Sequence, residues 1–290
     1  MSGGELAISG GGRVVQADTD AQVVALWLHG KSANTRRAYG REARQFMAFT
    51  GKTLPTTTLG DMQAYADDLE SRLSQSSRVR ALAAIKSLLS FAHLIGYLPV
   101  NVGAAEKLPA VKDTLAERIV SLDVVALVIA GERSARNRTL LRVLYYSGLR
   151  ASEVCGLRWR DVASRDGGAV QVTVQGKGGK TRAVVLPAHV AAELLALRGE
   201  ARGDDPVFLG RGGALTSGQV WRIVKAAGAR AGVPDMSPHW LRHACASHAL
   251  ERGATTALVR DTLGHASLAT TSRYLHARPG DSAGLYLPTV

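Results

Sequence analysis

Apolar residues recur at three- and four-residue steps from residue 20 to residue 97, which is the spacing of amphipathic helices. The pattern predicts four helices, separated by cap residues and glycines. The first carries residues 23–28, the second follows cap candidates at positions 32 and 34, the third covers residues 59–73, and the fourth covers residues 77–95. The sequence therefore predicts a small four-helix unit in its N-terminal third.

The pattern changes at three places along the chain. Residues 1–16 are glycine-rich and polar, so we expect a flexible N-terminus ahead of a helical unit over residues 17–100. Residues 101–114 show no periodicity and contain glycine, proline and lysine, which is typical of a linker. Residues 115–290 are mixed in character, and we expect them to form a second domain with a C-terminal tail.

A strand signal stands out in that second part. Residues 169–175 alternate between apolar and polar side chains, a glycine-rich turn follows over residues 176–180, and residues 181–186 form the second arm. This arrangement predicts a β-hairpin. The expected fold class is therefore mostly α with a small β-hairpin or sheet (α+β), in which a helical domain is followed by a mixed α/β domain.

The charge balance indicates the class of partner. Lysine and arginine exceed aspartate and glutamate by 36 − 24 = 12 over the 290 residues, and the sequence pI is about 10.1. Both parts contribute to this excess, since residues 1–112 have a net charge of 13 − 9 = +4 and residues 113–290 one of 23 − 15 = +8. An excess of this size favours a polyanionic partner, with nucleic acid ahead of a membrane surface.

Other function classes find little support. No apolar run is long enough to span a membrane and the N-terminus has no signal-peptide core, so we expect a cytoplasmic protein. Cys155 and Cys245 fit no metal-ligand spacing and suggest buried thiols in a reducing compartment. His239, His243 and His248 invite a zinc interpretation, but no HExxH motif or further ligand set accompanies them.

The run from Ser237 to His243 (SPHWLRH) carries the strongest chemical signal. Serine is a good N-cap and proline a good first helical residue, so a helix is expected to begin there. His239 and Arg242 are three residues apart and share a face of that helix. A planar guanidinium beside an imidazole can bind one phosphodiester. Tyr274, further along, could then attack the phosphorus and form a covalent phosphoester.

Three further positions complete this candidate site. Gly148 is expected to end a helix, which leaves Arg150 just beyond it and Glu153 three residues on, where its carboxylate could orient a basic side chain. Gly264 is expected to close another helix and to hold His265 on a tight turn. Taken singly, each of these residues is more often structural or solvated, and the combination is what favours chemistry.

The two lysines of the predicted hairpin also stand out. The chain has 28 arginines but 8 lysines, and Lys177 and Lys180 lie in one turn. Lysine can release a proton near neutral pH when its surroundings lower its pKa, whereas arginine cannot. A solvated turn lysine is the ordinary alternative. Further cations are candidates for binding the DNA backbone: Arg36, Arg37, Arg41, Arg44, Arg78, Arg80, Lys86 and Arg273.

Together these motifs resemble the tyrosine recombinase (phage integrase) family, and in particular its short bacterial members of the Xer type. The matching stretches are YSGLRASE at 146–153, GKGGK at 176–180, PHWLRH at 238–243, and LGH at 263–265 followed by Arg-Tyr at 273–274. The spacing also agrees, with 92 residues between the two arginines, 23 from the second arginine to the histidine, and 9 from there to the tyrosine. The resemblance covers roughly residues 18–278.

The resemblance implies roles for individual residues. Arg150 and Arg242 would form a phosphate clamp, His239 and His265 would assist with hydrogen bonds and protons, Lys177 would be the general acid, Tyr274 the nucleophile and Glu153 a supporting carboxylate. It implies a site-specific recombinase that cuts and rejoins DNA through a 3′-phosphotyrosyl bond, with neither metal, ATP nor another cofactor. Four copies would assemble on two DNA sites. A partner recombinase, the target sequence and the biological task stay open.

Two other functions compete with this interpretation. A type IB topoisomerase shares the phosphotyrosine chemistry but relaxes supercoils without exchanging strands between partners. A DNA-binding protein that kept this fold without catalysis would need none of the six reactive residues, all of which are present. A covalent protein–DNA adduct separates an enzyme from a binding protein, and strand exchange separates a recombinase from a topoisomerase.

Overall fold

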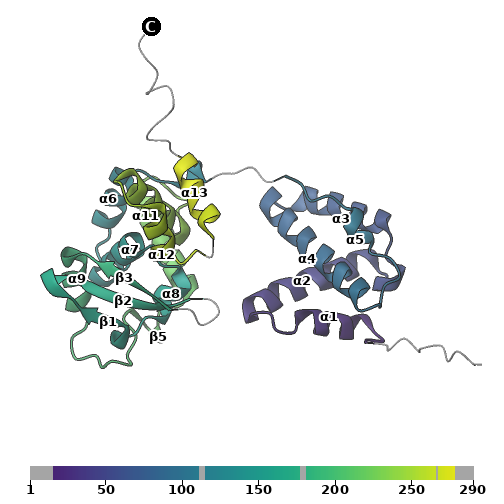
Figure 1. The fold of residues 1–290 in the computed structure, drawn as a ribbon, viewed down its shortest axis with the longest axis horizontal. Coiled ribbons are helices and arrows are strands. Elements are labelled where there is room, and N and C mark those ends of the chain that lie inside the picture. Colours follow the sequence, from purple (N-terminus) through teal and green to yellow (C-terminus); the bar gives the residue numbers. More distant parts are fainter. Residues whose placement is uncertain (1–15, 111–114, 177–180, 266, 278–290) are drawn as a thin grey trace, which may run out of the picture. The chain divides into compact units, whose positions relative to one another are not determined.

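The computed structural model describes residues 16–110, 115–176, 181–265 and 267–277. The chain divides into two compact units, Met1–Lys112 and Asp113–Val290, and each is described by itself (Figure 1). The predicted N-terminal tail over residues 1–16 falls almost wholly outside the described residues, as do the C-terminal tail from residue 278 and the end of the predicted linker.

The first unit contains the four predicted helices and two short additions. Helix α1 begins after Thr19, whose side chain and that of Gln22 form a reciprocal cap, and helix α2 begins after Ser32, which accepts a hydrogen bond from the backbone of Thr35. The apolar faces meet in a core that includes Trp27, Phe46 and Tyr65. The elements are α1 (Asp20–Leu28), α2 (Ala33–Thr50), the 3₁₀ turn η1 (Leu54–Thr56), α3 (Leu59–Arg72), α4 (Gln75–Leu94) and α5 (Val102–Ala105).

Part of the expected linker is ordered on this unit. Helix α5 was not predicted, because a four-residue helix is too short to show the periodicity of an amphipathic helix. Gly103 within it is buried against Leu89. The ammonium group of Lys86 donates a 2.6 Å hydrogen bond to the carbonyl oxygen of Gly103 and another to that of Glu106, and so holds this segment to α4.

The second unit is mostly helical. Its helices are α6 (Leu122–Ala130), α7 (Ala135–Ser147), α8 (Ala151–Gly156), α9 (Ala188–Ala196), α10 (Ser217–Arg230), α11 (Pro238–Glu251), α12 (Thr256–Leu263) and α13 (Leu268–Ala277). Short 3₁₀ turns occur at η2 (Ala116–Arg118), η3 (Trp159–Asp161) and η4 (Asp166–Gly168). Serine and threonine caps start most of the longer helices, as at Ser134 for α7 and Thr255 for α12.

The predicted hairpin is present as β2 (Val170–Gln175) and β3 (Thr181–Leu186). These strands pair antiparallel, and β1 (Val162–Ser164) adds to the other edge of β2. Val170, Val172 and Val174 alternate into the core, as the period-two pattern predicts. The small pair β4 (Leu209–Gly210) and β5 (Gly213–Ala214) was not predicted, because two-residue strands leave no alternation to detect.

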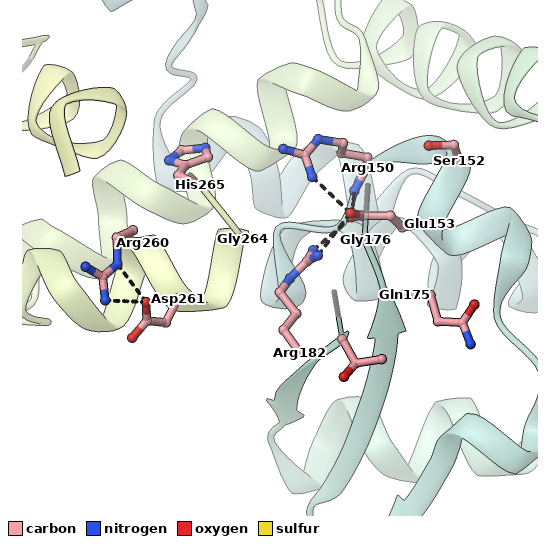
Figure 2. A pocket seen from close by; sticks show the side chains of 11 residues that line it. Arg150, Ser152, Glu153, Gln175, Gly176, Arg182, Arg260, Asp261, Gly264 and His265 are labelled. Carbon is pink, nitrogen blue, oxygen red and sulfur yellow. Dashed lines mark hydrogen bonds and ion pairs between the residues drawn. The ribbon is translucent and has the colours of Figure 1, made fainter. Parts of the chain in front are cut away.

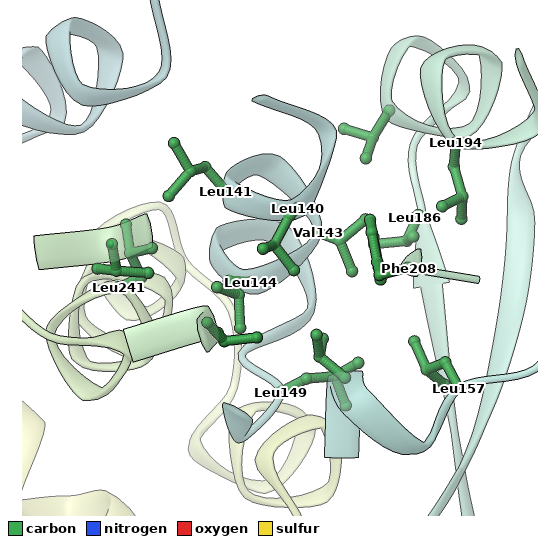
Figure 3. Close-up of a cluster of buried hydrophobic side chains, with 14 of the residues drawn as sticks. Leu140, Leu141, Val143, Leu144, Leu149, Leu157, Leu186, Leu194, Phe208 and Leu241 are labelled. Carbon is green, nitrogen blue, oxygen red and sulfur yellow. The ribbon is translucent and has the colours of Figure 1, made fainter. Parts of the chain in front are cut away.

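Helix α7 runs through the main core of this unit (Figure 3). Leu140, Leu141, Val143 and Leu144 of this helix are fully buried and lie between α11 on one side and the sheet on the other. A smaller apolar cluster holds the C-terminal helices: Leu115, Ile119, Ala246, Val259, Leu263 and Tyr274. These elements confirm the predicted fold class, mostly helical α+β. Among the described residues, no helix is both long and apolar enough to cross a membrane.

Candidate active site

Arg242 is the most deeply buried cation of the candidate site, with 4% of its surface exposed. Its Nη2 donates a 2.7 Å hydrogen bond to the carbonyl oxygen of Leu263, and its Nη1 donates to that of Gly148. These carbonyls lie at the C-terminal ends of α12 and α7, where helices leave unpaired acceptors and a partial negative charge. Burial lowers the pKa of Arg242 to about 10, with nearby Arg150 as the next cause.

The helix end that receives Arg242 depends on a glycine. Gly148 caps α7 with a positive φ of 60°, a conformation that favours glycine. A Cβ atom at this position would lie 2.3 Å from Cδ2 of Leu263 and 3.4 Å from Sγ of Cys245. Gly148 was predicted only to end a helix. Because it has no side chain, it also lets the ends of α7 and α12 pack closely enough for Arg242 to bind a carbonyl of each.

A carboxylate connects the second predicted arginine to the sheet. Glu153 accepts a 2.9 Å hydrogen bond from Arg150 Nη1, and its other oxygen accepts from the Arg150 backbone at 2.8 Å. Arg182 on β3 binds the same carboxylate with both terminal nitrogens, at 3.0 and 2.8 Å. Burial alone would raise the pKa of Glu153, but the bonds from Arg182 and the Arg150 backbone lower it to about 2.

Arg182 was not among the residues selected from the sequence. Besides binding Glu153, its Nε donates a 2.8 Å hydrogen bond to the carbonyl oxygen of Thr262 in α12. Its guanidinium also packs against Gly264 at the C-terminal end of α12. A Cβ atom added at Gly264 would lie only 3.0 Å from Arg182 Nη1. Arg182 thus joins β3 to α8 and α12. Its only sequence signal was a cation on an otherwise apolar hairpin arm.

Arg150, Glu153 and Arg182, but not the more deeply buried Arg242, line a cavity of about 1110 Å³ (Figure 2). Arg150, Glu153 and Arg182 lie on one side of it, and His265 and the Arg260–Asp261 ion pair come from α12 and the turn after it. The two hairpin arms reach the cavity with Gln175, Gly176 and Thr181. Lys177 and Lys180, predicted as general acid and DNA ligand, lie outside the described residues.

His265 connects the cavity to the predicted nucleophile. It lies just beyond Gly264, which closes α12 with a φ of 65°, as expected. Its Nδ1 is 2.8 Å from Oγ1 of Thr271 in α13, and its ring is parallel to that of Tyr274, with 6.3 Å between ring centroids. Desolvation and then the charges of Arg242, Arg150 and Arg182 lower the pKa of His265 to about 4, so the imidazole is neutral at pH 7.

Tyr274 lies on α13 with 5% of its surface exposed. Its hydroxyl is 2.8 Å from Nδ1 of His243 on α11, and burial raises the pKa of the phenol. The sequence analysis included His243 in the PHWLRH motif and weighed it as a zinc ligand, but gave it no catalytic role. Its signal was its place directly after Arg242, and the contact with Tyr274 arises from the packing of α11 against α13.

His239 lies at the first turn of α11, on the same helix as Arg242 and His243. Unlike Arg242, it is exposed. Surrounding atoms still partly desolvate it, and together with the charges of Arg242 and Arg150 this lowers its pKa. The structure therefore places His239 at the solvent side of the arginines rather than between them.

The cations predicted to bind DNA in the first unit fall into two groups. Arg36, Arg37, Arg41, Arg44 and Arg80 are exposed. Two of these also have partners within α2, since Arg37 donates to Asn34 and Arg41 forms a 2.7 Å ion pair with Glu42. Arg78 and Lys86 are partly buried and already have partners: Arg78 forms a 2.7 Å ion pair with Glu70, and Lys86 binds the two carbonyls described above. In the second unit, Arg273 precedes Tyr274 on α13 and is exposed.

Comparisons with known proteins agree with the resemblance seen in the motifs. Residues 117–280 match the phage integrase family, and residues 24–94 match the N-terminal SAM-like domain of phage integrases. The chain is 35% identical over 262 residues to the tyrosine recombinase XerC of Pelobacter propionicus, covering 84% of this chain and 85% of that protein. It is 33% identical over 279 residues to the tyrosine recombinase XerD of Mycobacterium tuberculosis, covering 84% and 88%.

A solved structure shows the same fold. A lambda integrase dimer bound to a COC′ core site superposes with a TM-score of 0.74 at 18% sequence identity, covering 91% of this chain and 95% of that chain. The matched region includes residues of both units. With the family pattern matched over more than half of the sequence, this chain is a member of the phage integrase family of tyrosine recombinases.

Proposed function

We propose that this chain is a site-specific DNA recombinase in which Tyr274 attacks a phosphodiester held by Arg150 and Arg242. The observation that carries the proposal is the position of His265. Its side chain lines the cationic cavity, and its ring is stacked parallel to that of Tyr274. A phosphate in the cavity would thereby lie next to the nucleophile. The product of the attack is a 3′-phosphotyrosyl bond and a free 5′-hydroxyl.

The arginines suit the charge that develops in this reaction. The pentacoordinate phosphorus carries more negative charge than the starting diester, and each well-placed donor can stabilise such a state by about 3 kcal/mol. Arg150 and Arg182 share one buried carboxylate, and Arg242 has only carbonyl oxygens as hydrogen-bond acceptors among the described contacts. The site therefore keeps a net positive charge, with His239 and His265 as neutral donors or acceptors.

The leaving 5′ oxygen needs a proton, and Lys177 is our candidate donor. The four residues 177–180 join Gly176 to Thr181, and both of these line the cavity. Because the covalent intermediate keeps the energy of the broken ester bond, rejoining requires no ATP. In our proposal the residues of this chain account for the phosphate binding and for the proton of the leaving 5′ oxygen without a cofactor.

DNA would be bound by both basic units. We propose that the exposed arginines of α2 and Arg80 of α4 bind the duplex backbone, with Lys180 and Arg273 adding contacts from the second unit. Four copies would assemble on two recombination sites in the bacterial cytoplasm, with or without a partner recombinase. The dimer of lambda integrase on its core site supports binding of more than one copy to DNA.

The test is a covalent trap on nicked DNA. A binding site is first recovered from a pool of random duplexes, and a nick is then placed beside each candidate phosphate so that the released 5′ fragment diffuses away. The wild-type protein should accumulate a protein–DNA adduct, and Tyr274→Phe should form none while keeping nearly the same affinity, because affinity comes from many phosphate contacts.

Adducts that persist in the Tyr274→Phe protein would remove Tyr274 from the reaction. A second assay separates the recombinase from a type IB topoisomerase. Two duplexes that carry the recovered site and different flanking lengths should exchange strands, whereas a topoisomerase would relax a supercoiled plasmid and yield no recombinant duplex.

A further inference from the structure

The reaction proposed above leaves one proton without an acceptor. Tyr274 must lose its phenolic hydrogen when its oxygen bonds to phosphorus, and the structure offers one nitrogen at hydrogen-bond distance among the described residues. That nitrogen is Nδ1 of His243, 2.8 Å from the hydroxyl oxygen. The ring centroids of His243 and Tyr274 are 5.7 Å apart and tilted by 45°, so the two side chains meet at their polar edges.

His265 is less suited to take this proton. Its ring is stacked parallel to Tyr274, with an interplanar angle of 4°, and its Nδ1 pairs with Thr271 at 2.8 Å. The next imidazole, that of His239, lies beyond His243, with 6.4 Å between the two ring centroids. Of the three histidines, only His243 has a described hydrogen bond to the reacting oxygen.

The surroundings of His243 keep its imidazole neutral and able to accept. The charged or titratable groups that face it are His239 and Arg242 from its own helix, Arg118 from η2, and Arg273 and Tyr274 from α13. Desolvation, followed by these positive neighbours, lowers the pKa of His243 to about 4. A neutral imidazole protonated at Nε2 presents a free lone pair at Nδ1.

We propose that His243 accepts the phenolic proton of Tyr274 during strand cleavage and returns it during rejoining, an inference that rests on the proposed function. In cleavage the O–H bond of Tyr274 breaks and an N–H bond forms at Nδ1 of His243. The Tyr274 oxygen bonds to phosphorus, and the bond from phosphorus to the 5′ oxygen breaks. The 5′ oxygen takes its proton from a different donor, for which Lys177 is the candidate.

Substrate binding would strengthen this base. A scissile phosphodiester held by Arg150 and Arg242 brings a negative charge near His243, and a nearby negative charge favours the protonated imidazole. His243 is therefore a weak base in the free protein and a stronger one when DNA occupies the site. This coupling keeps Tyr274 a protonated phenol, and thus a poor nucleophile, until a phosphate is present.

The same helix offers a matched control. His248 lies five residues after His243 on α11, and its Nδ1 is 2.9 Å from the hydroxyl of Tyr145. Both pairs join a histidine of α11 to a tyrosine of another helix with nearly equal distances. Tyr145 lies on α7 and takes no part in the proposed reaction. Replacing His248 therefore tests the structural value of such a pair alone.

The experiment measures single-turnover cleavage of the nicked substrate by the full chain, from pH 6 to 9. Asparagine at position 243 places an amide oxygen near the position of Nδ1, so it can accept a hydrogen bond from Tyr274 but cannot take its proton. We expect His243→Asn and His243→Phe to cleave about 10²-fold or more slowly than wild type, the usual loss for a general base. The residual rate of His243→Asn should rise tenfold per pH unit, because hydroxide must then remove the proton.

The control His248→Asn should cleave at the wild-type rate, and all variants should bind DNA with wild-type affinity in a gel shift. A wild-type rate for His243→Asn would overturn the proposal and leave His243 a positioning residue. A rate above wild type for His243→Phe would overturn it too, because the hydrogen bond would then restrain Tyr274. Absence of an adduct with the wild-type protein would instead reject the proposed function itself.

Discussion

The arginine side of the candidate active site is joined to the fold by many more contacts than the tyrosine side. Arg242 and Arg182 bind backbone carbonyls at the ends of α7 and α12, and Glu153 ties Arg150 to the sheet. Tyr274 has its hydrogen bond to His243, the parallel ring of His265 and a small apolar cluster. The proposed phosphate-binding side is thus preformed by the core, while the proposed nucleophile depends on one C-terminal helix.

Mutations on the two sides should therefore have different effects on the free energy of unfolding and on the cleavage rate. A change on the arginine side is expected to lower both the cleavage rate and the free energy of unfolding. A change at Tyr274 is expected to abolish chemistry with little effect on the fold. The predictions below test this distinction, beginning with the residue whose loss should have the largest combined effect.

Replacing Arg242 with methionine should affect both properties. The side-chain volume is nearly kept, but the carbonyls of Gly148 and Leu263 lose a charged donor, which we expect to cost about 2 kcal/mol of stability. Cleavage should fall by about 10³-fold, because the site loses a donor to the charged transition state. Tyr274→Phe should lower the stability by less than about 1 kcal/mol, since it removes one hydrogen bond.

Urea unfolding at pH 7, measured beside the covalent trap, checks both values. Equal stabilities of Arg242→Met and Tyr274→Phe would show that the arginine contacts contribute no more to the fold than the tyrosine does.

Replacing Lys177 with arginine should slow cleavage by about 10²-fold, the usual scale for losing a general acid. Arginine keeps the charge but does not release a proton near neutral pH. A substrate with sulfur in place of the bridging 5′ oxygen has a leaving group that needs no proton, so it should largely restore the rate. Equal defects on both substrates would show that Lys177 binds DNA instead.

Part of the geometry of the candidate site could be predicted because helix ends require particular residue types at particular local positions. Gly148 and Gly264 end helices by a local conformational preference, and each has the positive φ that such an end requires. Arg150 and Glu153 follow Gly148 within five residues and His265 follows Gly264 directly, whereas Tyr274 was selected from its motif and spacing. The structure brings Arg150 and Glu153 into contact and places His265 on the ring of Tyr274.

The missed residues depend on contacts between distant segments. Arg182 meets Glu153 because the register of β3 turns it toward α8, across 29 positions of sequence. His243 meets Tyr274 across 31 positions through the packing of α11 and α13. Elements β4, β5 and α5 were missed for a different reason, since two to four residues are too few to show a period.

Ionisation of Glu153 makes the stability contributed by the arginine side depend on pH. Its pKa of about 2 in the folded protein is below its ordinary value of 4.5, so the folded state prefers the carboxylate. The resulting stability, about 3 kcal/mol, is complete above pH 4.5 and is lost as the pH falls from 4.5 to 2. Glu153→Gln should remove most of it at pH 7, and cleavage should slow by about tenfold because Arg150 loses its orienting partner.

Thermal unfolding of the two proteins between pH 3 and 7 measures this effect. The gap between wild type and Glu153→Gln should narrow toward pH 3. A constant gap over the whole range would mean that the carboxylate charge contributes nothing specific to the fold.

The same distinction between structural and functional cations can be tested within the first unit, where the expected effects are smallest. Lys86, like Arg242, donates to backbone carbonyls, whereas Arg44 is exposed on α2. Arg44→Gln should weaken DNA binding and reduce the slope of log affinity against log salt by about 0.9, the value for one phosphate contact. Lys86→Met should leave that slope unchanged and lower the stability of the unit by about 1–3 kcal/mol, because two carbonyls lose a charged donor. Salt titrations of both variants on one duplex decide the matter: a reduced slope for Lys86→Met would place this lysine on DNA and end the parallel with Arg242.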